Sequence, residues 1–75
     1  MLIWEGISRK GVSVEIQYVS NNISRVSVWD LVSDNEKNLI MDYSWIKEVF
    51  AKNEEKEGLI SDIVKLSTCS IKSFL

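Results

Sequence analysis

The stretch Val12-Ser13-Val14-Glu15-Ile16-Gln17-Tyr18 decides the fold, because apolar and polar side chains alternate along it without a break. Such alternation, with β-branched and aromatic residues at the apolar positions, is typical of a strand with one buried face. The pattern returns at Val26-Ser27-Val28. Between the two stretches lie Asn21 and Asn22, residue types that tolerate the positive φ of a tight turn. The sequence therefore predicts a β-hairpin.

The register of this hairpin has two solutions. With a two-residue loop at Asn21-Asn22, the expected cross-strand pairs are Val14 with Trp29 and Val12 with Leu31. With a three-residue loop, they are Tyr18 with Val26 and Ile16 with Val28. The apolar positions of the second strand also change parity between Val28 and Trp29. That change predicts a β-bulge near residues 28–30.

Two further strands extend the predicted hairpin. Residues 2–7 form the first, and Ser8-Arg9-Lys10-Gly11 is the turn that joins it to the hairpin, with Gly11 in the last turn position. Residues 38–43 form the fourth strand, because Leu39, Met41 and Tyr43 alternate after a polar turn. The competing interpretation extends the following helix backward through residues 38–43.

The apolar spacing changes from two to three and four after residue 44, which predicts helices. Ser44 is expected to cap a short helix that places Trp45 in the core. Its apolar face carries Trp45, Ile46, Val49 and Phe50. A polar break follows, and the last helix has an apolar stripe formed by Ile60, Ile63, Val64, Ser67, Ile71 and Phe74. Leu59 and Leu66 broaden this stripe and are expected to offer a seam for a homodimer.

These elements predict an α+β fold in which an antiparallel meander of three or four strands is packed by a C-terminal α-helix. One version of this prediction curls the sheet toward a small barrel. With 75 residues, the chain is expected to be a single domain, residues 1–75, with a thin core. Its one cysteine cannot form an internal disulfide, so stability beyond ordinary packing would come from association.

Residue types suited to catalysis are scarce. The chain holds no histidine, which is the usual general base near neutral pH and the commonest metal ligand. Without a histidine to activate it, Cys69 is interpreted as an ordinary helix cysteine. A turn centred on Glu36 would set Asp30 opposite Asp42 as a carboxylate pair, although separate solvated acids are the simpler interpretation. The isolated glycines form no phosphate-binding loop. We expect no enzyme, no cofactor and no metal.

The aromatic content favours binding to another protein. Three tryptophans are more than so small a core needs, and Trp, Tyr and Arg are enriched at interface hot spots. The predicted partner-binding residues are Trp29, Tyr18, Arg25 and Trp4. Trp29 lies at the parity change of its strand and can face either side of the sheet. An additional apolar patch is expected from Val19, Ile23 and Ile40.

Two other functions stay open. A nucleic-acid-binding sheet needs aromatic residues interleaved with basic ones, and Tyr18, Arg25 and Trp29 beside Arg9 and Lys10 form only a thin cluster of that kind. The net charge of −2 argues against nonspecific binding to phosphates. The third possibility is a homodimeric bacterial regulatory subunit.

Composition also bears on location and origin. No signal-like start and no apolar run of membrane-spanning length occur, so we expect a cytoplasmic protein that does not bind membranes. Ile, Lys and Asn, whose codons are AT-rich, far outnumber Ala, Gly, Pro and Arg. This bias favours a low-GC genome. Together with the small size, it leads to the hypothesis of a phage or mobile-element protein that inhibits a host protein.

Overall fold

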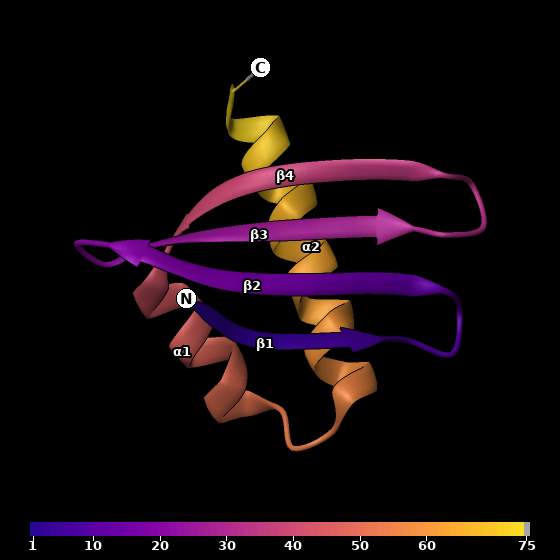
Figure 1. The fold of residues 1–75 in the computed structure, drawn as a ribbon, viewed down its shortest axis with the longest axis horizontal. Coiled ribbons are helices and arrows are strands. Elements are labelled where there is room, and N and C mark those ends of the chain that lie inside the picture. The colour runs from indigo at the N-terminus through magenta and orange to yellow at the C-terminus, as the bar shows by residue number, and fades with distance from the viewer. Residues whose placement is uncertain (75) are drawn as a thin grey trace.

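A computed structural model describes the backbone of residues 1–74 and the side chains of residues 1–67. Four antiparallel strands form a meander in the order β1-β2-β3-β4, and two helices follow (Figure 1). The elements are β1 (Leu2–Ile7), β2 (Val12–Ser20), β3 (Ile23–Asp30), β4 (Asn35–Asp42), α1 (Tyr43–Lys52) and α2 (Lys56–Phe74). The predicted α+β meander is confirmed, with four strands. The sheet is open, with β1 and β4 as its edges, so the barrel-like version of the prediction is wrong.

The β2–β3 hairpin has the predicted two-residue loop but neither predicted register. Asn21 and Asn22 have φ values of 50° and 63°, the left-handed pair that a type I′ turn needs. Next to the turn Ser20 pairs with Ile23, and an irregularity in the register between Tyr18 and Ser20 then leaves one extra residue in β2. Beyond it the pairs are Val14 with Val28, Ile16 with Val26 and Tyr18 with Ser24.

The extra residue in β2 brings the aliphatic side chains of both strands to one face. A regular ladder from a two-residue loop would set Val14 opposite Trp29 and divide the apolar residues between the two faces. The bulge therefore lies in β2 and not at residues 28–30, where β3 is regular. Leu31 and Val32 leave the strand and are exposed in the β3–β4 loop, Val32 at 82%.

Residues 35–42 are a strand and Tyr43 is the first residue of α1, so the helical alternative is wrong for residues 38–42 and the predicted strand ends one residue early. The change from strand to helix occurs at Asp42, which is the N-cap of α1 in place of the predicted Ser44. The Asp42 carboxylate accepts hydrogen bonds from the backbone N–H and the hydroxyl of Ser44. Asp30 pairs with Asn35, and Asp42 pairs with Ile23, so the two acids do not face each other.

Both helices lie against the same face of the sheet (Figure 1). The buried core between the two layers contains Val14, Ile16, Val26, Val28, Met41, Ile46, Val49, Leu59, Ile60 and Ile63. Leu59 is 4% exposed and Leu66 packs against this core. Leu59 therefore has little surface left for the predicted dimer seam, Leu66 keeps part of its side chain exposed, and the homodimer stays a prediction.

The sequence predictions about single side chains of the helices have different outcomes. Trp45 is 47% exposed on α1, so its predicted place in the core is wrong. The predictions for Cys69, Ile71 and Phe74 concern side chains outside the described residues. Neither helix within the described part of the chain is long and apolar enough to span a membrane.

Candidate protein-binding face

The face of the sheet turned away from the helices, called here the open face, presents the alternate residues of all four strands. Because successive side chains of a strand point to opposite faces, the buried positions of β2 and β3 assign the others to this side. Its members include Leu2, Glu5, Ile7, Ser13, Glu15, Gln17, Ile23, Arg25, Ser27, Trp29, Glu36, Asn38 and Ile40. In Figure 1 this face is turned toward the viewer.

Trp29 is the large aromatic residue of the open face and is 43% exposed. Ser13 on β2 and Glu36 on β4 are its direct cross-strand neighbours. Its indole N–H donates to the Asp34 carboxylate at 3.2 Å. The ring is therefore tethered at its polar end while part of its apolar surface stays in solvent.

The β3–β4 loop that supplies Asp34 is itself held by hydrogen bonds. The Asp30 carboxylate accepts from the backbone N–H groups of Val32 and Ser33, at 3.0 and 3.3 Å. The bond from Ser33, followed by that from Val32, lowers the pKa of Asp30 below its ordinary value. The backbone N–H of Leu31 donates to the carbonyl of Gly11 at 2.8 Å, which joins this loop to the β1–β2 turn. These bonds favour one position for Asp34 and hence for the Trp29 ring.

Acidic side chains dominate the charge of the open face. Glu5 and Glu15 are direct cross-strand partners, an arrangement of like charges that destabilises a sheet. The Gln17 amide donates to Glu15 at 3.1 Å, and the Asn38 amide donates to Glu36 at 3.2 Å. Arg25 is the one basic side chain that the described sheet carries on this face.

Exposed aliphatic residues lie at both ends of the open face. Ile7 is at the end that carries Trp29, since both residues pair with Ser13. Ile23 and Ile40 are at the opposite end, where Ile40 pairs with Arg25 and is 65% exposed. The face thus has two apolar ends and a polar, acidic middle.

The predicted partner-binding residues divide between the two faces. Trp29 and Arg25 share the open face, roughly 13 Å apart along β3 at about 3.3 Å per residue. Tyr18 is on the helix side, where its ring meets that of Tyr43 at a centroid distance of 5.1 Å. Trp4 is also there and packs edge-on against Phe50 at 6.4 Å. The structure therefore does not bring the four residues together.

Sequence reasoning missed the acidic row of Glu5 and Glu15 and the position of Ile7 beside Trp29. The alternation of polar and apolar residues within each strand was visible in the sequence. Only the register between strands, however, places Glu5 beside Glu15 and Ile7 near Trp29. For Val19, Ile23 and Ile40, all three side chains are exposed. Ile23 and Ile40 lie on the open face, and Val19 is the extra, unpaired residue of the bulge in β2 next to the Ser20–Ile23 pair.

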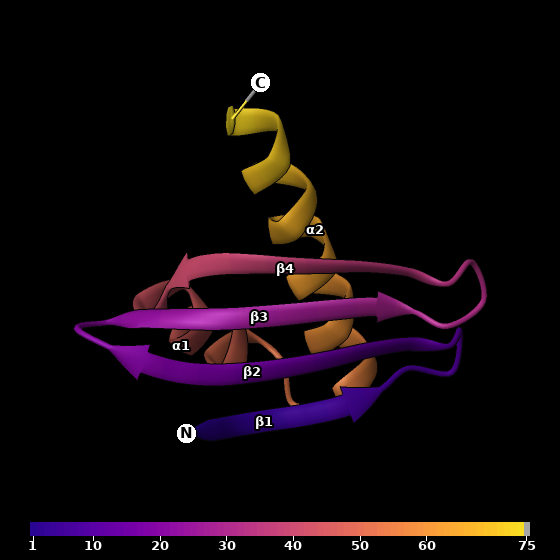
Figure 2. The same cartoon turned by 45° about the horizontal axis from the view of Figure 1, so that its top comes forward.

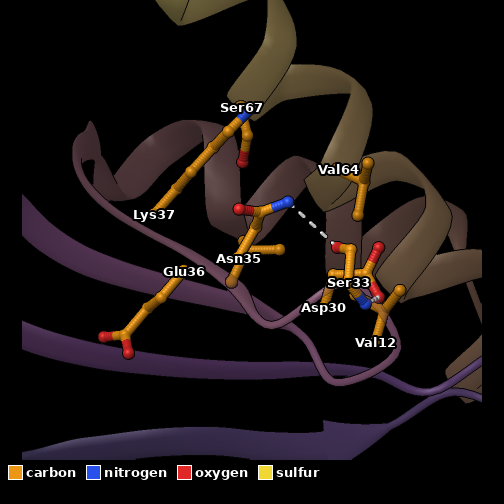
Figure 3. A pocket seen from close by; sticks show the side chains of 9 residues that line it. Val12, Asp30, Ser33, Asn35, Glu36, Lys37, Val64 and Ser67 are labelled. Carbon is orange, nitrogen blue, oxygen red and sulfur yellow. Dashed lines mark hydrogen bonds between the residues drawn. The ribbon is translucent and has the colours of Figure 1, made fainter.

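A shallow pocket of about 330 Å³ lies on the helix side of the sheet, between α2 and the ends of β3 and β4 that adjoin their connecting loop (Figure 3). Val12, Val28 and Val64 supply its apolar lining, and its polar lining includes Asp30 and Lys37. The Asp30 carboxylate is already engaged by the loop backbone. The described residues contain no group of three or more potential metal-binding side chains of His, Cys, Asp or Glu. We therefore place the candidate site on the open face.

Comparison with known proteins adds no assignment. No model of a protein family matches the chain, and no match was found among curated proteins or among solved structures. The functional argument consequently rests on the surface of the sheet.

Proposed function

We propose that this chain is a small non-enzymatic protein-binding module and that its open face is the contact surface. The observation that carries the proposal is the exposed, tethered ring of Trp29. An exposed aromatic side chain whose position is already fixed loses little conformational entropy on binding. Tryptophan is also among the residues that dominate interface energies.

The charges of the open face indicate the chemistry of the partner. Glu5, Glu15 and Glu36 give this face an excess of negative charge over Arg25. A partner surface with Lys or Arg side chains opposite Glu5 and Glu15 would relieve the repulsion between these two acids. The apolar ends at Ile7 and Ile40 would contact aliphatic or aromatic residues of the same partner.

A pair of tryptophan variants tests the proposal. Trp29→Ser and Trp45→Ser each remove an exposed indole, but Trp45 lies on α1 and not on the open face. In a cross-linking pull-down from the source organism's lysate, we expect wild type and Trp45→Ser to capture the same protein and Trp29→Ser to lose it. Circular dichroism establishes that all three proteins are folded. Capture that survives Trp29→Ser and disappears with Trp45→Ser would reject the open face.

Nucleic-acid binding is the alternative function. The acids of the open face would repel phosphates, and Tyr18 is on the other side of the sheet from Arg25 and Trp29. Retention on heparin or DNA at about 50 mM salt that falls steeply as salt is raised would favour the nucleic-acid alternative. We expect no retention.

The finer proposal is that the module inhibits its partner, as a phage or mobile-element product acting on a host protein. A binding face of this size on a chain of 75 residues can act by covering a functional surface of the partner. The test is an activity assay of the captured protein with wild type and with Trp29→Ser. Inhibition by wild type alone is expected, and equal activity in both mixtures would reject inhibition.

A further inference from the structure

The outer edge of β4 is a second surface that offers binding groups. No other strand of residues 1–74 pairs with this edge, so alternate N–H and C=O groups point outward along it. The C-terminal part of α2 continues past β4, as both views of the fold show (Figures 1 and 2). A fifth strand beside β4 would therefore lie on a helix that is already in place.

The two halves of β4 differ on the side that faces the helices. Toward α1, Met41 is buried and Leu39 packs against the core. Toward the β3–β4 loop, Lys37 also lies on the helix-facing side of the strand, where it is the cross-strand partner of Val28. Figure 3 shows Lys37 extending toward Ser67 on α2, whereas the carboxylate of Glu36 points away from the helix. Lys37 has no hydrogen bond or ion pair with the described residues.

An inward-pointing lysine on an edge strand protects that edge against pairing with other strands. Two copies of β4 paired antiparallel would set Lys37 opposite Leu39, Met41 or the other copy's Lys37. Leu39 and Met41 offer no charge to pair with the exposed ammonium group of Lys37, and a second Lys37 would repel it. The protection is specific for charge, however, because a carboxylate opposite Lys37 would form a favourable cross-strand pair.

We propose that the edge of β4 accepts an extended segment of a partner protein as a fifth strand. The segment alternates polar and apolar residues, placing apolar side chains beside Leu39 and Met41 and a Glu or Asp beside Lys37, all on the helix side of the sheet. Main-chain hydrogen bonds would supply affinity and the carboxylate would supply selectivity, as in other cases of strand addition. This site lies at the edge of the sheet and does not use Trp29, so it is independent of the proposed open-face contact.

The probe is a synthetic peptide, Thr-Val-Thr-Val-Thr-Glu-Thr, which in antiparallel pairing sets its two valines against Met41 and Leu39 and its glutamate against Lys37. The matched peptide has lysine in place of glutamate. Binding is followed by NMR titration of the isotope-labelled protein to millimolar peptide, with amide hydrogen exchange along β4 as the second readout. We expect the glutamate peptide to bind about tenfold more tightly to wild type and to slow exchange in β4.

Charge reversal makes the test specific. Lys37→Glu is expected to reverse the preference between the two peptides, and Lys10→Glu, in the β1–β2 turn, is expected to leave it unchanged. Trp29→Ser should bind the glutamate peptide as wild type does, which separates this site from the open face. Equal affinity for both peptides, no reversal with Lys37→Glu, or no binding of either peptide would overturn the proposal. Dimerisation of wild type through β4, detected by light scattering, would also overturn it.

Discussion

The indole N–H of Trp29 and the carboxylate of Asp34 form a hydrogen bond of 3.2 Å between β3 and the loop that follows it. Asp34 has a φ of 56°, in the left-handed region that few non-glycine residues adopt. A residue in an unfavourable backbone conformation thus holds the exposed ring at the loop end of the proposed contact surface. Position and orientation of the Trp29 ring depend on this loop.

The first prediction separates the role of the side chain of Asp34 from that of its backbone. Asp34→Gly removes the hydrogen bond and suits the positive φ, so we expect stability close to wild type, a shifted Trp29 indole N–H resonance and weaker partner binding. Asp34→Ala also removes the bond but retains the backbone strain, and it should lower stability by about 1 kcal/mol. Denaturant unfolding and NMR measure the two effects. An unchanged indole resonance in Asp34→Gly would contradict the role given to this bond.

The second prediction concerns the extra residue in β2. Deleting Val19 leaves a regular ladder from the two-residue loop that keeps Tyr18 opposite Ser24 and Val14 opposite Val28, so the aliphatic side chains of both strands stay on one face. We expect the deletion variant to unfold cooperatively and to keep the native pairs of β2 and β3. Val19→Ser keeps the residue count at an exposed position and should change stability by no more than about 0.5 kcal/mol. Loss of cooperative unfolding in the deletion variant would show that the bulge does more than accommodate one extra residue.

Alternation and turn chemistry are local properties, and they were sufficient to predict the meander. The Asn21-Asn22 turn was visible because few residue types accept positive φ. The register was not predictable, since it depends on a bulge at Val19 that has no local signature. Two competing solutions were derived from the apolar pattern, and the bulge provides a third that gathers the aliphatic residues on one face.

The errors in the helix predictions have similar local causes. Asp42 and Ser44 are both favourable N-cap residues, and only the end of β4 decides between them. Trp45 is about 100° around the helix from Ile46, at the margin of the buried arc. The acidic row of the open face was missed for a topological reason. Glu5 and Glu15 are ten positions apart in the chain, and the β1–β2 register makes them neighbours.

The third prediction tests the close approach of Trp4 to Gly6. A Cβ atom at position 6 would lie 2.7 Å from Cη2 of the Trp4 ring. Gly6→Ala must therefore displace this ring from its edge contact with Phe50, and we expect a loss of about 1–3 kcal/mol of stability. Ser13→Ala, on the open face, is the control and should cost no more than about 0.5 kcal/mol.

A double-mutant cycle shows whether the Trp4 ring causes the loss. In a Trp4→Leu background the steric conflict is reduced, so Gly6→Ala should cost much less there than in wild type. The measurement is denaturant unfolding of the four proteins. Equal costs in both backgrounds would assign the effect to the β1 backbone and not to the ring.

The fourth prediction follows from the carboxylates of Asp42 and Asp30, whose pKa values lie below the ordinary value of 3.8. For Asp42 the main causes are the hydrogen bonds from the hydroxyl and then the backbone N–H of Ser44, with a contribution from the Asn22 amide. Because the unfolded chain binds protons more readily at these sites, their stabilisation is present above pH 3.8 and is lost as pH falls through the lower folded-state values.

Asp42→Asn tests this linkage while preserving an N-cap residue. Its stability should fall less steeply than that of wild type as the pH is lowered below 3.8, and combination with Asp30→Asn should flatten the curve further. Between about pH 6 and 8, stability should be nearly constant because the chain has no histidine to titrate. Denaturant unfolding across the pH range provides the measurement. If the double variant loses stability in acid as steeply as wild type, the capping bonds at Asp42 and Asp30 do not account for the acid sensitivity.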